Sequence, residues 1–452
     1  MEQIERISGK QASRDIMRLF LPCLVELLLG QLAGMVDTMM VSGIGTKALN
    51  AVGICGNPVL LLMMIFTALN VGTTALISRA KGEGNVHKAN EIARQAIVIN
   101  LLAGLVMMVA GWFLVDAMIA MMGAPDAETA ALAAEYMRYR IVAMPFLSIG
   151  LANNAILRGM GNTRAPMLYN LVANGINVLF NWLLIHGIWI FPEMGVAGAA
   201  LATTICNFSG TAISCVLLLR GISDIKLNLR EKFSFDRLLL SNIFKIGMPS
   251  MGEQLVFRIG HILFSRQLIS LGSTDYAAHQ IVWNILNLIM LLGSAMQMAV
   301  APLTGQCLGR EDIKRAEDYH KYSIRILFGA KVISALACLF LGRQLLMMYA
   351  PEPAVMDTAL PLLRILGAYL PIMAFQYVYG GALAGAGDTK YNAPIFMISV
   401  IAVRLPLAIV AKDILGWGLI GINLATAVDV LLRHFLFYAR YKTGKWKTVK
   451  LK

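Results

Sequence analysis

Hydrophobic residues fall into twelve long runs, separated by short polar stretches. Each run is long enough to cross a bilayer as a helix, which takes roughly 20 mostly apolar residues. The Gly and Pro residues inside the runs are tolerated in membrane helices, and no run alternates as a barrel strand would. The pattern predicts an all-α polytopic membrane protein with transmembrane helices at 16–41, 48–78, 93–115, 131–156, 166–187, 195–219, 243–270, 277–304, 323–342, 358–383, 392–411 and 417–439.

Composition and charge placement support a membrane protein. Of 452 residues, 58% are hydrophobic and 14% charged, whereas an average soluble protein is about a quarter charged. The net charge of +13 would suggest a nucleic-acid partner in a soluble protein. The basic residues gather in alternate connecting segments, however, and the opposite loops hold only Lys47, Arg343 and Lys412. The positive-inside rule then places both termini in the cytoplasm and excludes a nucleic-acid partner.

The second half of the chain repeats the first at an offset of 226–227 residues. The matches include Pro22 and Glu26 with Pro249 and Glu253, MMGAP at 121–125 with MMYAP at 347–351, and LRGMGNTR at 157–164 with LAGAGDTK at 383–390. Each half holds six spans, an even number, so both halves enter the bilayer from the same side. The repeat predicts two six-helix bundles related by a parallel pseudo-two-fold axis along the membrane normal.

This repeat also predicts the domain organisation. We expect an N-terminal lobe at 1–219, a cytoplasmic linker at 220–242, a C-terminal lobe at 243–439 and a basic cytoplasmic tail at 440–452. A duplication of this kind is typical of transporters, in which two lobes rock against each other around a substrate cavity.

A few charged residues lie inside the predicted spans, where charges are costly and mark functional sites. Asp37 and Glu26 are eleven residues apart on the first span, which puts both on one side of the helix about 16 Å apart. Glu26 has a repeat partner in Glu253, which suits a structural role or a symmetric gate, whereas Asp37 aligns with Phe264. Asp37 therefore belongs to the first half alone and is the first candidate for function. The alternative is an interfacial carboxylate that only hydrates the helix end.

The fifth span carries four asparagines on one face, at i, i+4, i+7 and i+11: Asn170, Asn174, Asn177 and Asn181. Carboxamide oxygens near a carboxylate suit a hard monovalent cation, or a carboxyl group that takes up a proton. Hydrogen bonding between helices is the structural alternative. Both roles are compatible, because Asn170 and Asn174 can pack while Asn177 and Asn181 coordinate.

The seventh span carries a second polar stripe. It comprises Gln254, Arg258, His261 and Ser265, with Glu253 beside it. A buried Arg normally needs a carboxylate, and we expect Glu253 or Glu26 to supply it. This stripe is a candidate for the substrate cavity or gate, or for a lock between the lobes.

Several of these features together resemble the MATE family, multidrug and toxic compound extrusion, of the multidrug/oligosaccharidyl-lipid/polysaccharide flippase superfamily. The resemblance covers essentially the whole chain. It rests on Asp37, the RAKGEGN and RGMGNT loops, Asn177 and Asn181, GVAGAALAT at 195–203 and the repeat of six spans.

The resemblance implies an antiporter. Related proteins let Na⁺ or H⁺ run inward and drive organic, often cationic, compounds outward. By the family pattern, Asp37 is the ion-coupling carboxylate, with Asn177, Asn181 and Thr203 around it. Asp37, Asn177 and Asn181 are the candidate ligands of a bound Na⁺. Glu253 matches an acid found in the seventh span of one branch, but the matching position in the tenth span is Met373. Na⁺ and H⁺ both remain candidates for the coupling ion.

The expected function is therefore secondary active multidrug efflux from the cell, by a monomer in the cell inner (plasma) membrane that needs no cofactor. The nearest alternative is a flippase for a lipid-linked or polar lipid substrate, which Arg258, Arg266 and Arg404 keep open. A membrane-embedded transferase is disfavoured because acids are not clustered for Mg²⁺. An ATP-driven pump is disfavoured because no phosphate-cradling GxxxxGK[ST] loop is present. We expect no enzyme activity.

Overall fold

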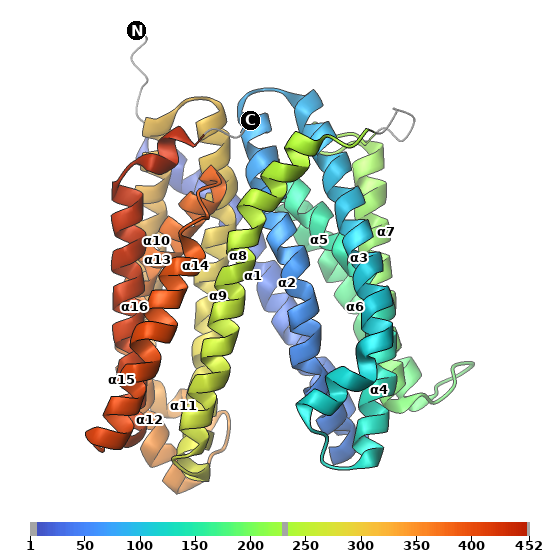
Figure 1. Cartoon of the computed structure of the whole chain (residues 1–452), viewed down its shortest axis with the longest axis vertical. Coiled ribbons are helices and arrows are strands. Elements are labelled where there is room, and N and C mark those ends of the chain that lie inside the picture. The colour runs from blue at the N-terminus through green and yellow to red at the C-terminus, as the bar shows by residue number, and fades with distance from the viewer. Residues whose placement is uncertain (1–6, 228–233, 450–452) are drawn as a thin grey trace. The chain divides into compact units, whose positions relative to one another are not determined.

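The computed structural model describes residues 7–227 and 234–449 and is almost entirely helical there (Figure 1). Parts of the predicted linker and tail, at 228–233 and 450–452, lie outside the described residues. The helices of the first half are α1 (Gly9–Ser42), α2 (Thr46–Gly82), α3 (Val86–Met122), α4 (Ala127–Val142), α5 (Met144–Gly159), α6 (Arg164–His186) and α7 (Gly195–Arg220).

The second half follows the same order. Its helices are α8 (Arg237–Ile269), α9 (Ser273–Gly309), α10 (Ile313–Phe340), α11 (Gly342–Met347), α12 (Pro353–Ala368), α13 (Leu370–Ala386), α14 (Asn392–Phe396), α15 (Leu405–Ile409) and α16 (Gly418–Lys442). The wider π-helical turns η1 (Met397–Arg404) and η2 (Val410–Ile414) interrupt the eleventh span, and the 3₁₀ turn η3 (Lys445–Thr448) follows the last helix.

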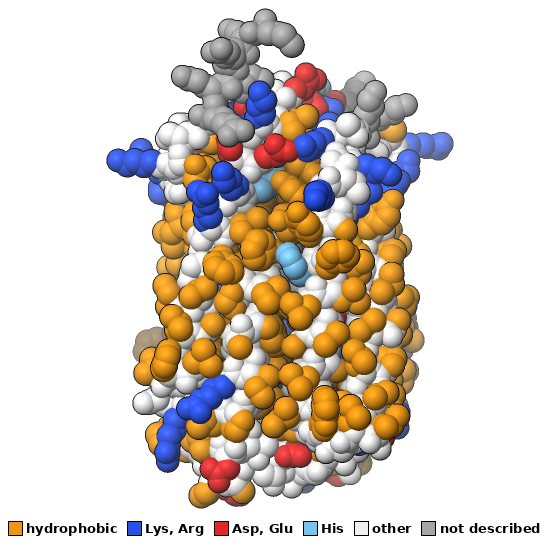
Figure 2. Space-filling model, turned by 90° about the vertical axis from the view of Figure 1, so that its left-hand side faces the viewer, with side chains coloured by type: hydrophobic (Ala, Val, Ile, Leu, Met, Phe, Trp, Pro, Cys, Tyr) orange, Lys and Arg blue, Asp and Glu red, His pale blue; other side chains and the backbone are white. Residues whose placement is uncertain are grey.

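The helices confirm the predicted membrane architecture. Within the described residues, nine are long and apolar enough to cross a bilayer, and two bent pairs raise that number to eleven. The seventh predicted span is α8, a helix of 33 residues that is not among these eleven. Large apolar side chains such as Phe113 and Phe340 are 80% and 77% exposed, which suits lipid and would be unfavourable in water. The face in Figure 2 is hydrophobic over most of its height, with Lys and Arg mainly toward one end.

Local signals recur at equivalent places in the two halves. The Asn85 side chain accepts a hydrogen bond from the backbone N–H of Lys88 and caps α3, and Asp312 caps α10 in the same way. Such caps satisfy N–H groups that the first helical turn leaves unpaired. The α4–α5 and α12–α13 pairs both bend by 48°. In each pair a proline occupies the second position of the second helix, where it breaks the backbone ladder.

The chain forms two compact units, each with its own core. Unit 2 comprises Val25–Gly247, and unit 1 comprises the residues up to Leu24 together with those from Met248 onward. The two divisions of the chain therefore fall inside α1 and α8. The predicted lobe limits, 1–219 and 243–439, differ from the units mainly in the first part of α1, and they stay a prediction.

Candidate polar sites in the two units

The first candidate site in unit 2 is centred on Asp37 of α1. The amide of Asn181, on α6, donates a hydrogen bond to Asp37 Oδ1 and also lies 3.4 Å from Asn177 Oδ1. Asn177 and Asn181 are buried, whereas Asp37 is half-buried. The structure thus brings together three of the four residues that the family pattern assigned to ion coupling.

Thr203 does not complete this cluster. Its hydroxyl donates to the backbone carbonyl of Ala199, 3.0 Å away on the same helix, and makes no described bond to Asp37. Arg140 of α4, to which no motif in the sequence pointed, acts electrostatically on the Asp37 carboxylate. Arg140 lies in a different span, so only the folded arrangement reveals its effect.

The donor set around Asp37 is suitable for a small cation or a proton. Asp37 supplies a carboxylate, and the Oδ1 atom of Asn181 is a buried oxygen with no hydrogen-bond partner among the described residues. Carboxylate and carboxamide oxygens are ligands for hard cations. No group of three or more His, Cys, Asp or Glu residues that could hold a metal ion occurs in the described part of the chain.

A second carboxylate in unit 2, Glu26, is already paired. Arg158 Nη2 and Asn170 Nδ2 lie 2.7 and 2.8 Å from Glu26 Oε1. The Glu26–Asn170 and Asp37–Asn181 bonds both join residues 144 positions apart, so α1 and α6 run in the same direction at this contact. The asparagine face of α6 thus holds one neutralised carboxylate and, three helical turns away, one whose only donor among the described residues is the Asn181 amide. Asn174 is half-buried between them and has no described side-chain hydrogen bond.

The seventh-span stripe differs from expectation. Glu253 of α8 accepts a hydrogen bond of 2.8 Å from Asn392 Nδ2 and does not pair with Arg258 in the described structure. The expected pair of Glu253 with Arg258 is therefore wrong, whereas a pair of Arg258 with Glu26, which already bonds to Arg158, stays a prediction. The physical reason is that α8 presents Glu253 toward the eleventh span rather than along its own helix. Gln254, Arg258 and His261 are half-buried.

Unit 1 also contains a buried ionic cluster that the sequence analysis missed. Asp429 of α16 is fully buried, bonds to Arg433 one turn later, and lies 3.9 Å from Arg404 Nη1. Arg404 ends η1, and Arg433 Nε also lies 3.3 Å from the Ser399 hydroxyl. The charged pair at i and i+4 in an apolar span was the signal that could have revealed this cluster.

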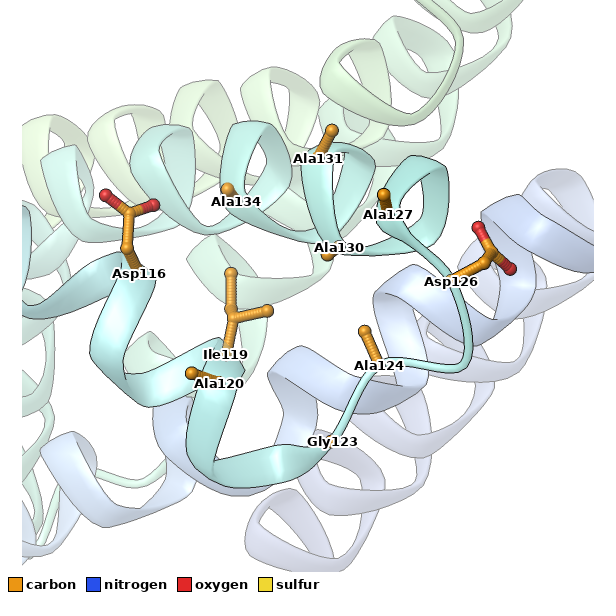
Figure 3. Close-up of a pocket in the computed structure, with 10 residues that line it drawn as sticks. All are labelled: Asp116, Ile119, Ala120, Gly123, Ala124, Asp126, Ala127, Ala130, Ala131 and Ala134. Atoms are coloured by element: carbon orange, nitrogen blue, oxygen red, sulfur yellow. The ribbon is translucent and has the colours of Figure 1, made fainter.

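A shallow groove lies at the α3–α4 connection of unit 2 and has a volume of about 580 Å³ (Figure 3). Alanine side chains form most of its surface, with Asp116 and Asp126 toward opposite ends. Asp116 Oδ1 lies 3.6 Å from Arg138, and Asp126 caps α4 through the Thr129 N–H. Both carboxylates therefore already bond to other groups of the protein.

Comparison with known proteins decides the family. The profile of the MatE family matches residues 22–183 and again 249–410. The chain belongs to the MatE family. The two matched segments begin 227 residues apart, which confirms the internal repeat in this MatE protein.

Relatives and solved structures agree with this assignment. A probable multidrug resistance protein NorM of Thermotoga maritima is 26% identical over 443 residues, covering 96% of this chain and 93% of that protein. An FAD transporter of Shewanella oneidensis is 23% identical over 429 residues, covering 94% and 93%. An outward-facing multidrug resistance MATE family transporter of the MOP superfamily has a TM-score of 0.89 at 22% identity, covering 98% of this chain and 100% of that chain. The MatE protein is thus a membrane transporter of this fold rather than an enzyme.

Proposed function

We propose that this MatE protein is a secondary active exporter that exchanges Na⁺ or H⁺ for small organic, often cationic, compounds. The observation that carries the proposal is the Asp37 carboxylate, held at membrane depth by the Asn181 amide and not by a cation in direct contact. A carboxylate in that setting can take up a proton or help to bind Na⁺. We further propose that the protein works as a monomer in the plasma membrane with both termini in the cytoplasm.

Coupling requires that the ion binds the two states of the transporter differently, because equal binding would shift nothing. In the outward-facing state, the ion binds at Asp37 with Asn177 and Asn181 and weakens substrate binding. In the inward-facing state, the ion leaves and the substrate binds again. Arg140 biases this cycle, because its positive charge opposes cation binding at Asp37 and favours release.

The other candidate residues receive different roles in this proposal. Glu26 is a scaffold residue, because Arg158 already neutralises it. Glu253, Gln254, Arg258 and His261 of unit 1, with Asn174 of unit 2, are candidates for contact with substrate. The buried arginines of unit 1 also keep a flippase for a polar lipid as the second candidate function.

The proposal can be tested by substrate efflux from vesicles that contain the purified protein. Na⁺ and proton gradients are imposed separately, and ethidium is the probe. We expect one gradient to drive transport by the wild type and by Asp116→Asn, a control that removes an exposed carboxylate of the same unit. We expect Asp37→Asn to lose gradient-driven transport. Full transport by Asp37→Asn would refute the assignment, and lipid-headgroup translocation without ethidium efflux would favour the flippase.

A further inference from the structure

Unit 1 contains four side-chain rings that follow one another in nearly parallel orientation, and we call this set the ring ladder. It runs from Phe257 to His261 of α8, then to Trp283 and His279 of α9. Successive ring centroids are 6.4, 5.9 and 6.0 Å apart, with interplanar angles of 14°, 28° and 16°. These values are typical of offset-stacked rings.

The ring ladder lies between positively charged groups. Arg258 is the residue after Phe257 and acts electrostatically on His261. At the other end, Phe264 lies 6.0 Å from His279, and the Arg404 guanidinium carbon lies 3.9 Å from the centre of the Phe264 ring. The one described carboxylate near Arg404, that of Asp429, is bonded to Arg433. Glu253, one turn before Phe257 on α8, is bonded to the Asn392 amide. With Arg258 and Arg404 against this one carboxylate, positive charge predominates beside the ring ladder.

Four nitrogens along this arrangement are buried and have no hydrogen-bond partner among the described residues. They are Nε of Arg258, Nδ1 of His261, Nδ1 of His279 and Nε of Arg404. The two arginine nitrogens are donors only, and each imidazole nitrogen can donate in one tautomer. Buried donors are usually paired, because an unpaired one costs free energy. The complementary partner is a group with several acceptor oxygens and a negative charge.

The ring ladder keeps part of its surface accessible, although Phe396 and Phe264 pack against its two ends. Phe257, Arg258, His261 and Trp283 are half-buried, whereas His279 is 4% exposed. A planar aromatic compound can stack on exposed rings whatever its substitution, because every such compound has a π-face. Aromatic rings also attract cations, but the adjacent guanidinium groups of Arg258 and Arg404 would repel a positively charged ligand.

We propose that unit 1 binds planar aromatic compounds that carry an acidic group, with the ring system on the ring ladder and the acid at Arg258. This inference rests on the proposed transport function and adds a substrate class to it. It places a cation-coupling carboxylate in unit 2 and an anion-binding aromatic surface in unit 1, so that ion and substrate need not share a ligand group.

The test uses two flavins that differ by one phosphate group. The full-length protein in detergent is equilibrated by dialysis with flavin mononucleotide or riboflavin, against empty micelles. A charge-assisted hydrogen bond to the phosphate should make flavin mononucleotide bind about tenfold more tightly than riboflavin. Equal dissociation constants for the two flavins would overturn the proposal.

Variants of one helix locate the anion contact. Arg258→Gln should raise the dissociation constant of flavin mononucleotide about tenfold and leave that of riboflavin unchanged, while Arg258→Lys should give a smaller loss. Arg237→Gln, at an exposed position of the same helix, should change neither. If Arg258→Gln does not fold, the comparison of flavins on the wild type still decides. Flavin binding without ion-driven efflux would retain this site and refute the antiport alone.

Discussion

Replacement of Glu26 by Gln should destabilise unit 2, because it leaves the Arg158 charge without its partner. Arg158 Nη2 lies 2.7 Å from Glu26 Oε1, and the two side chains are only 19% and 10% exposed. Loss of one partner of a buried ion pair costs about 3–5 kcal/mol. Asn170 can still donate to the glutamine oxygen, and Arg158 keeps some exposure. We therefore expect a loss near the lower limit, about 3 kcal/mol.

The measurement is denaturant-induced unfolding of the purified protein in mixed micelles, followed by tryptophan fluorescence. The double variant Glu26→Gln/Arg158→Gln removes both charges, so its loss should be smaller than the sum of the single losses by about 2 kcal/mol. Asp37→Asn is the matched control. It keeps an acceptor for Asn181 and should change stability by less than about 1 kcal/mol. Additive single losses, or a neutral Glu26→Gln, would refute the scaffold role of Glu26.

Three further predictions concern other parts of the fold. Asp429→Asn should cost about 3 kcal/mol or more by leaving buried arginines uncompensated, and addition of Arg433→Gln should recover part of that loss in the same unfolding assay. The hydrogen bonds that Asp126 accepts at the start of α4 hold its pKa below the usual value. The ionised Asp126 cap therefore stabilises α4 above about pH 4 and loses this effect as the pH falls through the lowered pKa. Asp126→Ala removes the cap, so the melting temperature of this variant should differ less between about pH 6 and pH 3 than that of the wild type. Gly385→Ala would put a Cβ atom 2.1 Å from a backbone oxygen of α9 and should cost about 1–3 kcal/mol, whereas Gly30→Ala, with open space around it, should be neutral; equal losses would contradict this packing argument.

The order of the spans could be predicted from the sequence because each span satisfies its own backbone hydrogen bonds and needs only local hydrophobicity. The breaks in the helices could not be predicted, because an apolar residue has the same hydropathy in an α-helix as in the π-helical turns of 397–404. These turns matter because Arg404 lies at the end of the first one.

The candidate site was predictable only where one helix carries the pattern. The spacing of Asn177 and Asn181 placed them on one face, and the structure adds that this face meets Asp37. Partners from separate spans, such as Arg158 for Glu26 or Asn392 for Glu253, depend on packing that no local spacing encodes. The pair of Asp429 and Arg433 was visible in the sequence, but its third member, Arg404, comes from another span.

The claim that Asp37 links ion binding to substrate binding can be tested by measuring the affinity for ethidium. The dissociation constant of ethidium is measured in detergent over a range of Na⁺ concentrations and, separately, of pH, for the wild type and for Asp37→Asn. We predict that the wild-type constant rises with one of the two ions and that the constant of Asp37→Asn depends on neither. An Asp37→Asn variant with the ion dependence of the wild type would contradict the claim.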